Sequence, residues 1–355
     1  MAYNRKQRLN DNIKAIETAF ILDREQRTPT ARERLLLERY CGFGGLKCIL
    51  NPARELADAV HWAKSDLELF APTVELHRLI RENSKNESEY KQLMDSLKQS
   101  VLTAFYTPSA ITEALADVLK EHQIIPEKVL EPSAGIGAFV DSVLDNNPKA
   151  DIMAFEKDLL TGKILRHLHP EQKVRIEGFE KIEKPFNDYF DLAISNIPFG
   201  DVAVFDPSYT AMKGMRALVT RRIHNYFFVK ALDTVRDGGL VAFITSQGVL
   251  NAKNNSAARF MMLYHADLVS AIRLPNNLFT ENANTEVGSD LIILQKNIRK
   301  ESLRGDDNLL DTVYNDENRI PTNNYFLEHP ERIIHTTAKL DTDPFGKPAM
   351  IYTHE

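Results

Sequence analysis

The sequence predicts an α/β fold, in which an open and mostly parallel sheet carries helices on both faces. The main observation is an alternation of short apolar runs with amphipathic helical segments, from about residue 101 to residue 296. The second is a composition of 43% hydrophobic and 26% charged residues, which is typical of an ordinary globular protein. At 355 residues the chain is long enough for one large domain or two smaller ones.

Residues 1 to about 100 are expected to be helical. Apolar residues recur there at helical spacing, first from Leu9 to Phe20 and again from Tyr90 to Val101. Between them, the Gly42-Phe43-Gly44-Gly45 run predicts a tight turn between helices. The run could instead approach a phosphate, but it lacks the Lys-Ser/Thr of a phosphate-binding loop and does not follow a strand.

The α/β part opens with a helix, for which Thr107 is the expected cap and Pro108 the first helical residue. A later helix is expected over residues 223–235, with Asp237-Gly238-Gly239 as its glycine stop. Two further helices are expected at 136–144 and 158–168. The expected strands are residues 128–131, 152–156, 174–176, 190–196, 240–244, 268–273 and 291–294.

Charge and composition limit the possible functions. The formal net charge of −6 argues against a general binder of polyanions, so any nucleic-acid contact must come from a local patch. No apolar run approaches the roughly 20 residues of a membrane span, and the N-terminus lacks the apolar core of a signal peptide. The two cysteines, Cys41 and Cys48, are too far apart for a CxxC pair and form no zinc pattern. We therefore expect a cytoplasmic, reduced protein without a metal site.

A loop of small residues follows the first strand, where ligands bind in open α/β sheets. It contains Gly135 and Gly137 but has Val140 where the dinucleotide fingerprint has a third glycine. Glu156, at the tip of the next strand, is well placed to accept hydrogen bonds from two ribose hydroxyls. Together these favour a nucleoside-containing cofactor without a pyrophosphate. Alternatively, Glu156 is a surface acid paired with Lys157.

A second polar turn follows the strand at 190–196 and has the sequence Asn196-Ile197-Pro198-Phe199. The Asn196 amide oxygen and the Ile197 carbonyl offer two acceptors, because Pro198 keeps Ile197 extended. Phe199 adds a flat face beside them. Such a set suits a planar ring with an exocyclic amino group, such as adenine. The alternative is an ordinary Pro-Phe turn.

These elements together resemble the N6-adenine DNA methyltransferases, in the order where the cofactor half precedes the catalytic half, over about residues 101 to 296. The resemblance implies a Rossmann-like sheet of seven strands and S-adenosylmethionine as cofactor. Phe105-Tyr106-Thr107-Pro108 is similar to the opening motif of the family, and Asn196-Ile197-Pro198-Phe199 to its catalytic tetrapeptide, with Ile197 in place of the commoner proline. The resemblance implies that the cofactor-binding residues are Tyr106, Thr107, Pro108, Glu131, Ser133, Ala134, Gly135, Gly137, Glu156, Lys157, Phe179 and Glu180.

The resemblance also implies that the target adenine leaves the DNA stack and packs on Phe199, while Asn196 and the Ile197 carbonyl hold its amine. No acidic residue occurs between Ser208 and His224, so a local basic patch is expected to contact DNA phosphates. Its members are Lys213, Arg216, Arg221 and Arg222. The alternative is a solvated loop whose charges balance acids elsewhere. The polar Asn282–Thr285 stretch is a further candidate border of the target pocket.

The expected domains are a helical region (1–100), a methyltransferase domain (101–300) and a C-terminal extension (301–355). Gly200-Asp201 after the tetrapeptide is similar to large methylase–helicase fusions on mobile elements, which implies a helicase part downstream and a place in restriction-modification. Two other readings stay open. The same tetrapeptide serves enzymes that methylate RNA or protein glutamine, and a methyltransferase fold can persist as a binding module with weak or no transfer.

Overall fold

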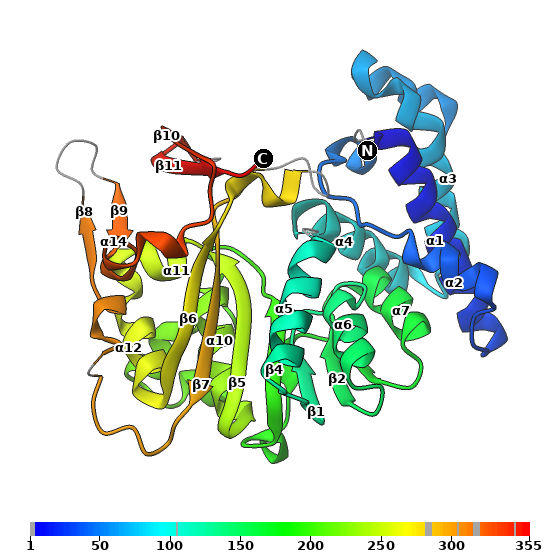
Figure 1. Cartoon of the computed structure of the whole chain (residues 1–355). Helices are drawn as coiled ribbons and strands as arrows, with labels where there is room; N and C mark the ends of the chain where they lie inside the picture. Colours follow the sequence, from blue (N-terminus) through cyan, green and yellow to red (C-terminus); the bar gives the residue numbers. More distant parts are fainter. Residues whose placement is uncertain (1–3, 104–105, 281–285, 304, 315–319, 344–345) are drawn as a thin grey trace.

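The computed structural model describes residues 4–103, 106–280, 286–303, 305–314, 320–343 and 346–355. Figure 1 shows a central sheet with helices on either side and a separate group of N-terminal helices at one end of the molecule. The predicted α/β class and the helical N-terminal region are therefore confirmed. Among the described residues, no helix combines the length and apolar character that a membrane crossing requires.

The central sheet is built from β1 (Lys128–Glu131), β2 (Asp151–Phe155), β3 (Lys173–Arg175), β4 (Phe190–Asn196), β5 (Val235–Ser246), β6 (Ala266–Leu274) and β7 (Ser289–Lys296). Their order across the sheet is β3-β2-β1-β4-β5-β7-β6. The pairs from β3 to β5 are parallel, whereas β7 runs antiparallel to both β5 and β6. The prediction of a mostly parallel sheet with seven strands is thus confirmed.

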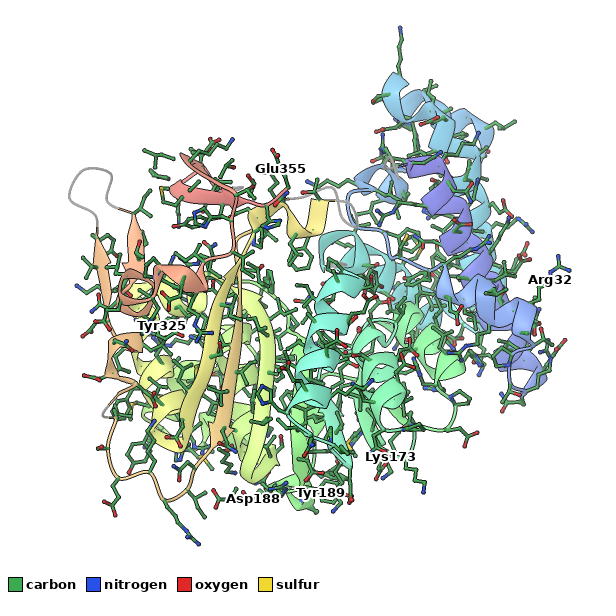
Figure 2. The ribbon with its side chains drawn as sticks, in the orientation of Figure 1. Arg32, Lys173, Asp188, Tyr189, Tyr325 and Glu355 are labelled. Atoms are coloured by element: carbon green, nitrogen blue, oxygen red, sulfur yellow. The ribbon has the colours of Figure 1, made fainter. Side chains whose placement is uncertain are left out.

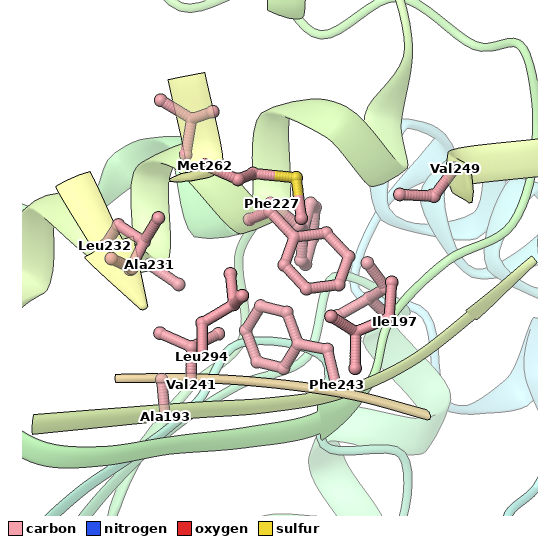
Figure 3. Close-up of a cluster of buried hydrophobic side chains, with 14 of the residues drawn as sticks. Ala193, Ile197, Phe227, Ala231, Leu232, Val241, Phe243, Val249, Met262 and Leu294 are labelled. Carbon is pink, nitrogen blue, oxygen red and sulfur yellow. The ribbon is translucent and has the colours of Figure 1, made fainter. Parts of the chain in front are cut away.

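Helices cover both faces of the sheet because successive strand residues point to opposite sides. One core cluster unites α5 (Ser109–Glu121), α6 (Ala138–Asn146) and one residue of α7 (Leu159–Leu168) with strand residues such as Ile194 and Ile244. The other unites α10 (Ile223–Thr234) and α12 (Ser256–His265) with their neighbours in the strands, such as Ala193 and Phe243. Figure 3 shows part of this second cluster, with Phe227 and Met262 near Phe243. Short helices link these elements: α8 (Pro207–Thr210), α9 (Met215–Val219) and α11 (Gly248–Asn251).

The predicted glycine stop of the helix at 223–235 is wrong. α10 ends at Thr234, and Val235 already pairs with Phe190 in the sheet. Gly238 and Gly239 lie within an irregularity of β5, where the pairing jumps from Val235 to Leu240. A Cβ at Gly239 would lie 2.9 Å from the Arg236 carbonyl oxygen. The same Cβ would lie 3.1 Å from the Phe190 and Asp191 carbonyl oxygens of β4. Gly239 therefore permits a close approach of β4 and β5 instead of ending a helix.

Pro108 also differs from its predicted place. It is the N-cap of α5, with an extended ψ of 141°, and the helix begins at Ser109. The Pro108 carbonyl accepts a hydrogen bond from the Ile111 amide at 3.0 Å. Proline has the φ that a first helical residue needs, but its ψ here is not helical, so the first turn starts one residue later than predicted.

The N-terminal helices pack on the α/β part through α7. They are α1 (Arg5–Glu25), α2 (Ala31–Glu38), α3 (Phe70–Glu82) and α4 (Glu87–Thr103). Their shared core includes Leu160, Ile164 and Leu168 of α7. The predicted turn at Gly42–Gly45 follows α2 and precedes a short 3-10 helix, η1 (Lys47–Leu50). The buried Asn12 side chain fixes this turn, because it donates to the Gly42 carbonyl and accepts from the Cys41 amide.

The C-terminal residues add small hairpins at the edge of the sheet. Figure 1 shows β8 (Thr312–Tyr314) beside β9 (Pro321–Asn323), and β10 (Thr337–Thr342) beside β11 (Pro348–Thr353). Figure 2 shows Tyr325, in α14 (Asn324–Glu328), on the same side of the molecule as these hairpins. Tyr325 and Phe326 belong to the same buried cluster as α10 and α12. Part of the C-terminal extension therefore shares the main core.

A buried ion pair joins β6 to β7. The Arg273 guanidinium donates to Asp290 Oδ1 at 2.9 Å and to Oδ2 at 3.2 Å, and the two side chains are 2% and 0% exposed. The Arg273 guanidinium also lies 4.2 Å from the centre of the Phe326 ring. Burial raises the pKa of Asp290, while Arg273 opposes this rise. Asp290 therefore needs the Arg273 guanidinium to stay ionised in this buried position.

Replacing Arg273 by Met should lower the free energy of unfolding by about 3–5 kcal/mol, because Asp290 would stay buried without its cation. The matched control is Arg78→Ala, which removes the exposed pair with Glu82 and should cost less than about 1 kcal/mol. Urea unfolding followed by circular dichroism measures both. Similar losses in the two variants would contradict the importance of burial.

Candidate active site

A cavity of about 900 Å³ lies at the carboxyl ends of β1, β2, β3 and β4. Its size is in the usual range of small-molecule sites, and its position is where open α/β sheets bind ligands. The loop after β1 contributes residues 131–136, the ends of β2 and β3 contribute 156–159 and 176–180, and the turn after β4 contributes 196–199. The predicted cofactor loop and the predicted adenine-binding turn thus share one cavity.

Gly135 lets the loop after β1 pass close to an aromatic ring. Its φ is +58°, and a Cβ there would lie 2.9 Å from the Tyr106 ring. A side chain at this position would be strained and would press on Tyr106, which itself lines the cavity. The Gly135 amide donates to the Glu156 carboxylate at 2.8 Å and so joins the loop to the end of β2.

Glu156 is held by the backbone and not by a lysine. Its carboxylate accepts hydrogen bonds from the Gly135 amide and, at 2.7 Å, from the Asp158 amide. Lys157 instead lies 3.6 Å from Glu180. Burial, and then the nearby Asp158 charge, raise the pKa of Glu156 to about 8, although the backbone amides oppose this rise. The alternative of a surface acid paired with Lys157 is therefore wrong.

Glu131, at the end of β1, is a buried acid in the cavity wall. It is 2% exposed, and its Oε2 atom has no hydrogen-bond partner among the described residues. Burial, together with the charges of Asp141 and Glu156, raises its pKa well above the ordinary value. A buried acceptor of this kind is costly unless a ligand or a proton satisfies it.

Phe179 and Glu180 line the cavity from η4 (Phe179–Lys181). Phe179 is 1% exposed and packs between Phe155 and Phe227, with ring centroids 5.8 Å and 5.3 Å away. The Glu180 carboxylate folds against Gly178, where a Cβ would lie 2.1 Å from its Oε2 atom. Gly178 therefore makes room for an acid at this end of the cavity.

In the turn after β4, the Ile197 side chain packs into the hydrophobic core. That side chain is 1% exposed and belongs to the core cluster of Figure 3. The Ile197 amide donates to the Ile244 carbonyl at 3.0 Å, and its own carbonyl accepts no hydrogen bond from the described residues. Asn196, Ile197, Pro198 and Phe199 all line the cavity. The Phe199 ring packs edge-on against Phe279, 6.4 Å between centroids.

Most of the predicted catalytic and cofactor-binding residues line this cavity, but two of them do not. Pro108 caps α5 instead. Gly137 faces α7, where a Cβ would lie 2.5 Å from His169 Nε2, so this glycine serves helix packing. Phe105 and Asn282–Thr285 fall outside the described residues. The other predicted cofactor residues line the cavity: Tyr106, Thr107, Glu131, Ser133, Ala134, Gly135, Glu156, Lys157, Phe179 and Glu180.

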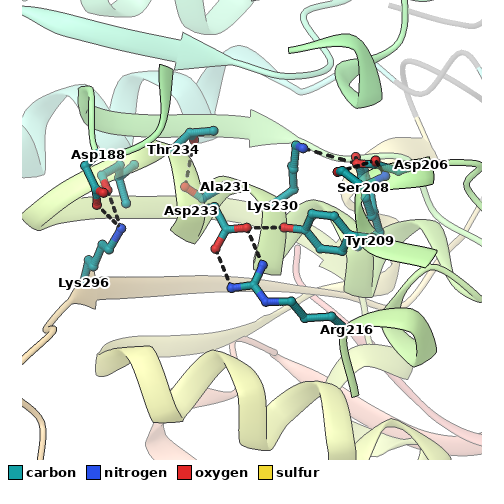
Figure 4. Close-up of polar contacts among 12 residues, drawn as sticks. Asp188, Asp206, Ser208, Tyr209, Arg216, Lys230, Ala231, Asp233, Thr234 and Lys296 are labelled. Atoms are coloured by element: carbon teal, nitrogen blue, oxygen red, sulfur yellow. Dashed lines mark hydrogen bonds and ion pairs between the residues drawn. The ribbon is translucent and has the colours of Figure 1, made fainter. Parts of the chain in front are cut away.

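The predicted basic patch is partly neutralised. Arg216 makes a two-bond ion pair with Asp233, which also accepts from Tyr209, as Figure 4 shows. Arg222 lies 2.8 Å from Asp201. Both acids lie outside the acid-free stretch 208–224, so the local sequence did not predict these ion pairs. Lys213 and Arg221 are exposed, and no ion pair joins either of them to another described residue.

Sequence reasoning missed two walls of the cavity. One is the segment 202–205, in which Val202 is 60% and Phe205 79% exposed. The other is α4, which the N-terminal region supplies. The exposed aromatic just after the Asn196 turn was a usable signal for the first. For α4, the only signal was a stripe of small and polar residues opposite its apolar stripe.

Comparison with known proteins gives a consistent result. A family model described as N-6 DNA Methylase matches residues 88–349. Defense against restriction protein B of Escherichia phage P1 is 29% identical over 201 residues, which are 55% of this chain and 8% of that protein. Type II methyltransferase M.XamI of Xanthomonas campestris pv. amaranthicola is 25% identical over 173 residues, 45% of this chain and 33% of that protein. The chain thus matches only a minor part of either relative.

Solved structures are also similar. One is a Listeria monocytogenes protein assigned to the class I S-adenosylmethionine-dependent methyltransferases, with 16% identity and a TM-score of 0.47. The alignment covers 84% of this chain and 90% of that one.

Glu156 should make stability fall as the pH rises. Its pKa is raised from 4.5 to about 8, so between these values the folded state holds a proton that the unfolded state has lost. Stability decreases with pH wherever the folded state binds more protons. Glu156→Gln should therefore show a flatter decline of the free energy of unfolding between pH 5 and about 8 than the parent protein. The free energy of unfolding is measured by denaturant titration at each pH. If it declines equally with pH in the two proteins, the raised pKa is contradicted.

Proposed function

Because this chain belongs to the N-6 DNA methylase family, we propose that it transfers a methyl group from S-adenosylmethionine to the N6 amine of adenine in DNA. The observation that carries this proposal is the shared cavity, in which the Asn196 turn and the loop after β1 face the same space. The names of two relatives, a defence-against-restriction protein and a type II methyltransferase, support a role in marking DNA against restriction.

The residues of the cavity fit S-adenosylmethionine. The partnerless Oε2 atom of Glu131 is a buried acceptor suited to the cationic methionine end of this cofactor. Glu156 offers its carboxylate to ribose hydroxyls, and Phe179 and Glu180 offer an apolar face and an acceptor to the adenine. When bound, the cofactor supplies an electrophilic methyl group on its sulfonium.

In the proposed mechanism, this chain positions the acceptor amine and needs no strong base. The lone pair of the adenine amine is delocalised into the ring, which makes this nitrogen a poor nucleophile. The Asn196 side-chain oxygen and the Ile197 carbonyl accept its two protons and favour a more tetrahedral nitrogen, whose lone pair then points at the methyl group. Positioning and electrostatics carry the rate.

A target adenine would have to leave the duplex to enter this cavity. Phe199 lines the cavity beside Asn196, and its edge-on contact with Phe279 holds the ring in place for stacking. The exposed Phe205 at the same cavity offers a second apolar surface to an extruded base. Stacking on aromatic side chains is a common way to offset the cost of unstacking.

Domain organisation is part of the proposal. We propose a methyltransferase domain over residues 101–300, preceded by the helical region 1–100 and followed by the extension 301–355. The match covers only 8% of the phage P1 protein, so that relative is far longer than the matched segment.

Asn196→Ala should lower methyl transfer to adenine-containing DNA by about 100-fold or more, because one of the two acceptors for the amine is lost. Mass spectrometry of digested nucleosides measures N6-methyladenine, and RNA and protein acceptors assayed in parallel test the competing substrates. The matched control is Asn146→Ala, whose amide instead donates to Ala116 far from the cavity. Full activity of Asn196→Ala on DNA would refute the assignment.

Arg221→Glu combined with Lys213→Glu should weaken binding to duplex DNA and flatten its dependence on salt, because fewer phosphates would be neutralised. Lys149→Glu combined with Lys120→Glu is the control, because both residues are exposed, neither lines the cavity, and the net charge changes equally. Fluorescence anisotropy at several salt concentrations measures both effects. If the Arg221/Lys213 variant binds as tightly as the Lys120/Lys149 variant, the contact surface lies elsewhere.

A further inference from the structure

Helix α4 has two faces of different chemistry. Leu93, Leu97 and Val101 are buried in the core of the N-terminal helices. On another side, five polar residues follow the i, i+3, i+4, i+7, i+8 spacing of a single helical stripe and line the cavity. They are Gln92, Asp95, Ser96, Gln99 and Ser100.

Ser96 is the buried centre of this stripe, at 6% exposure. Its hydroxyl donates to the Asp158 carboxylate and accepts from the Leu160 amide at 3.0 Å. Asp158 is also the N-cap of α7, since its other carboxylate oxygen accepts from the Thr161 amide at 2.7 Å. Ser96 of α4 therefore holds both the N-cap of α7 and its second residue, Leu160, by hydrogen bonds.

The hydrogen-bond network of Ser96 and Asp158 continues to Glu156. The Asp158 amide donates to Glu156 Oε1 at 2.7 Å, and the Gly135 amide holds Oε2 at 2.8 Å. The position of the Glu156 carboxylate thus depends on where residue 158 is held. Ser96 holds residue 158 by its side chain, from a helix outside the sheet.

We propose that α4 is a wall of the cofactor site and that Ser96 is a positioning residue for Glu156. Through Asp158 it keeps the Glu156 carboxylate oriented towards the ribose hydroxyls of the cofactor. The inference rests on the proposed use of S-adenosylmethionine. It assigns the N-terminal helices a part in cofactor binding, besides packing on α7.

Further contacts of the N-terminal helices reinforce this wall. The Tyr40 hydroxyl lies 3.2 Å from the Thr161 hydroxyl, and the Tyr40 ring packs edge-on against Tyr106 of the cavity. Ser100, the other buried serine of the stripe, accepts from the Phe43 amide at 3.2 Å. The Gly42–Gly45 turn therefore helps to hold α4 in place through this hydrogen bond, although the turn itself does not line the cavity.

The test is a double-mutant cycle on cofactor affinity, measured by titration calorimetry with S-adenosylmethionine. Ser96→Ala should raise the Kd about 10-fold in the parent protein, as expected for a hydrogen bond to a charged group. In a Glu156→Gln background the same change should raise it less than about 2-fold, because the positioned carboxylate is already gone. Ser96→Thr, which keeps the hydroxyl, should restore most of the affinity.

Lys98→Ala is the matched control, since Lys98 is exposed on α4 and does not line the cavity; its Kd should match the parent. Equal losses on Ser96→Ala in both backgrounds, or no loss in the parent, would overturn the positioning role while leaving the proposed cofactor intact. Absence of binding by the parent protein would instead overturn the cofactor assignment and this inference with it.

Discussion

The pairing of β1 with β4 is the constraint on which the site depends. These strands lie side by side in the sheet, with Leu130 opposite Ala193, although about sixty residues separate them in the chain. Because the two strands are parallel, the loops that follow them meet at one edge. The Ser195 hydroxyl donates to the Ser133 carbonyl at 3.1 Å and joins the two loops directly. A change that shifted this register would separate the cofactor loop from the Asn196 turn.

Three acids around the cavity illustrate how the fold holds carboxyl groups near a ligand. Glu156 and Asp158 accept hydrogen bonds from backbone amides and, for Asp158, from the Ser96 hydroxyl. These bonds oppose the rise in pKa that burial causes, without bringing in a competing lysine. Glu131 has less support, because its Oε2 atom lacks a partner. Burial of such groups costs stability, and sites commonly tolerate that cost where a ligand completes the hydrogen bonds.

Local patterns in the sequence predicted the sheet, the cofactor loop and the Asn196 turn. Each buried strand and the polar residues after it are contiguous, so a short segment contains the whole pattern. Apart from Pro108, whose own ψ decides its place, the failures involve partners distant in the chain. Gly239 is required by the backbone of β4 and Gly137 by His169, and neither neighbour is visible from local spacing. Arg216 is neutralised by Asp233 of the following helix. Ser96 acts across more than sixty residues, and helical periodicity by itself could not identify its partner.

The hydrogen bond between the Ile197 amide and the Ile244 carbonyl bears on which residues can follow Asn196. A proline at position 197 would preset the backbone angle but could not donate this bond, whereas isoleucine extends the ladder of β4 by one rung and buries its side chain in the core. The turn can thus be made rigid either by a proline at position 197 or by a hydrogen bond to the adjacent strand. In this chain, a proline at position 197 would therefore leave the Ile244 carbonyl of β5 without the amide that it now accepts from.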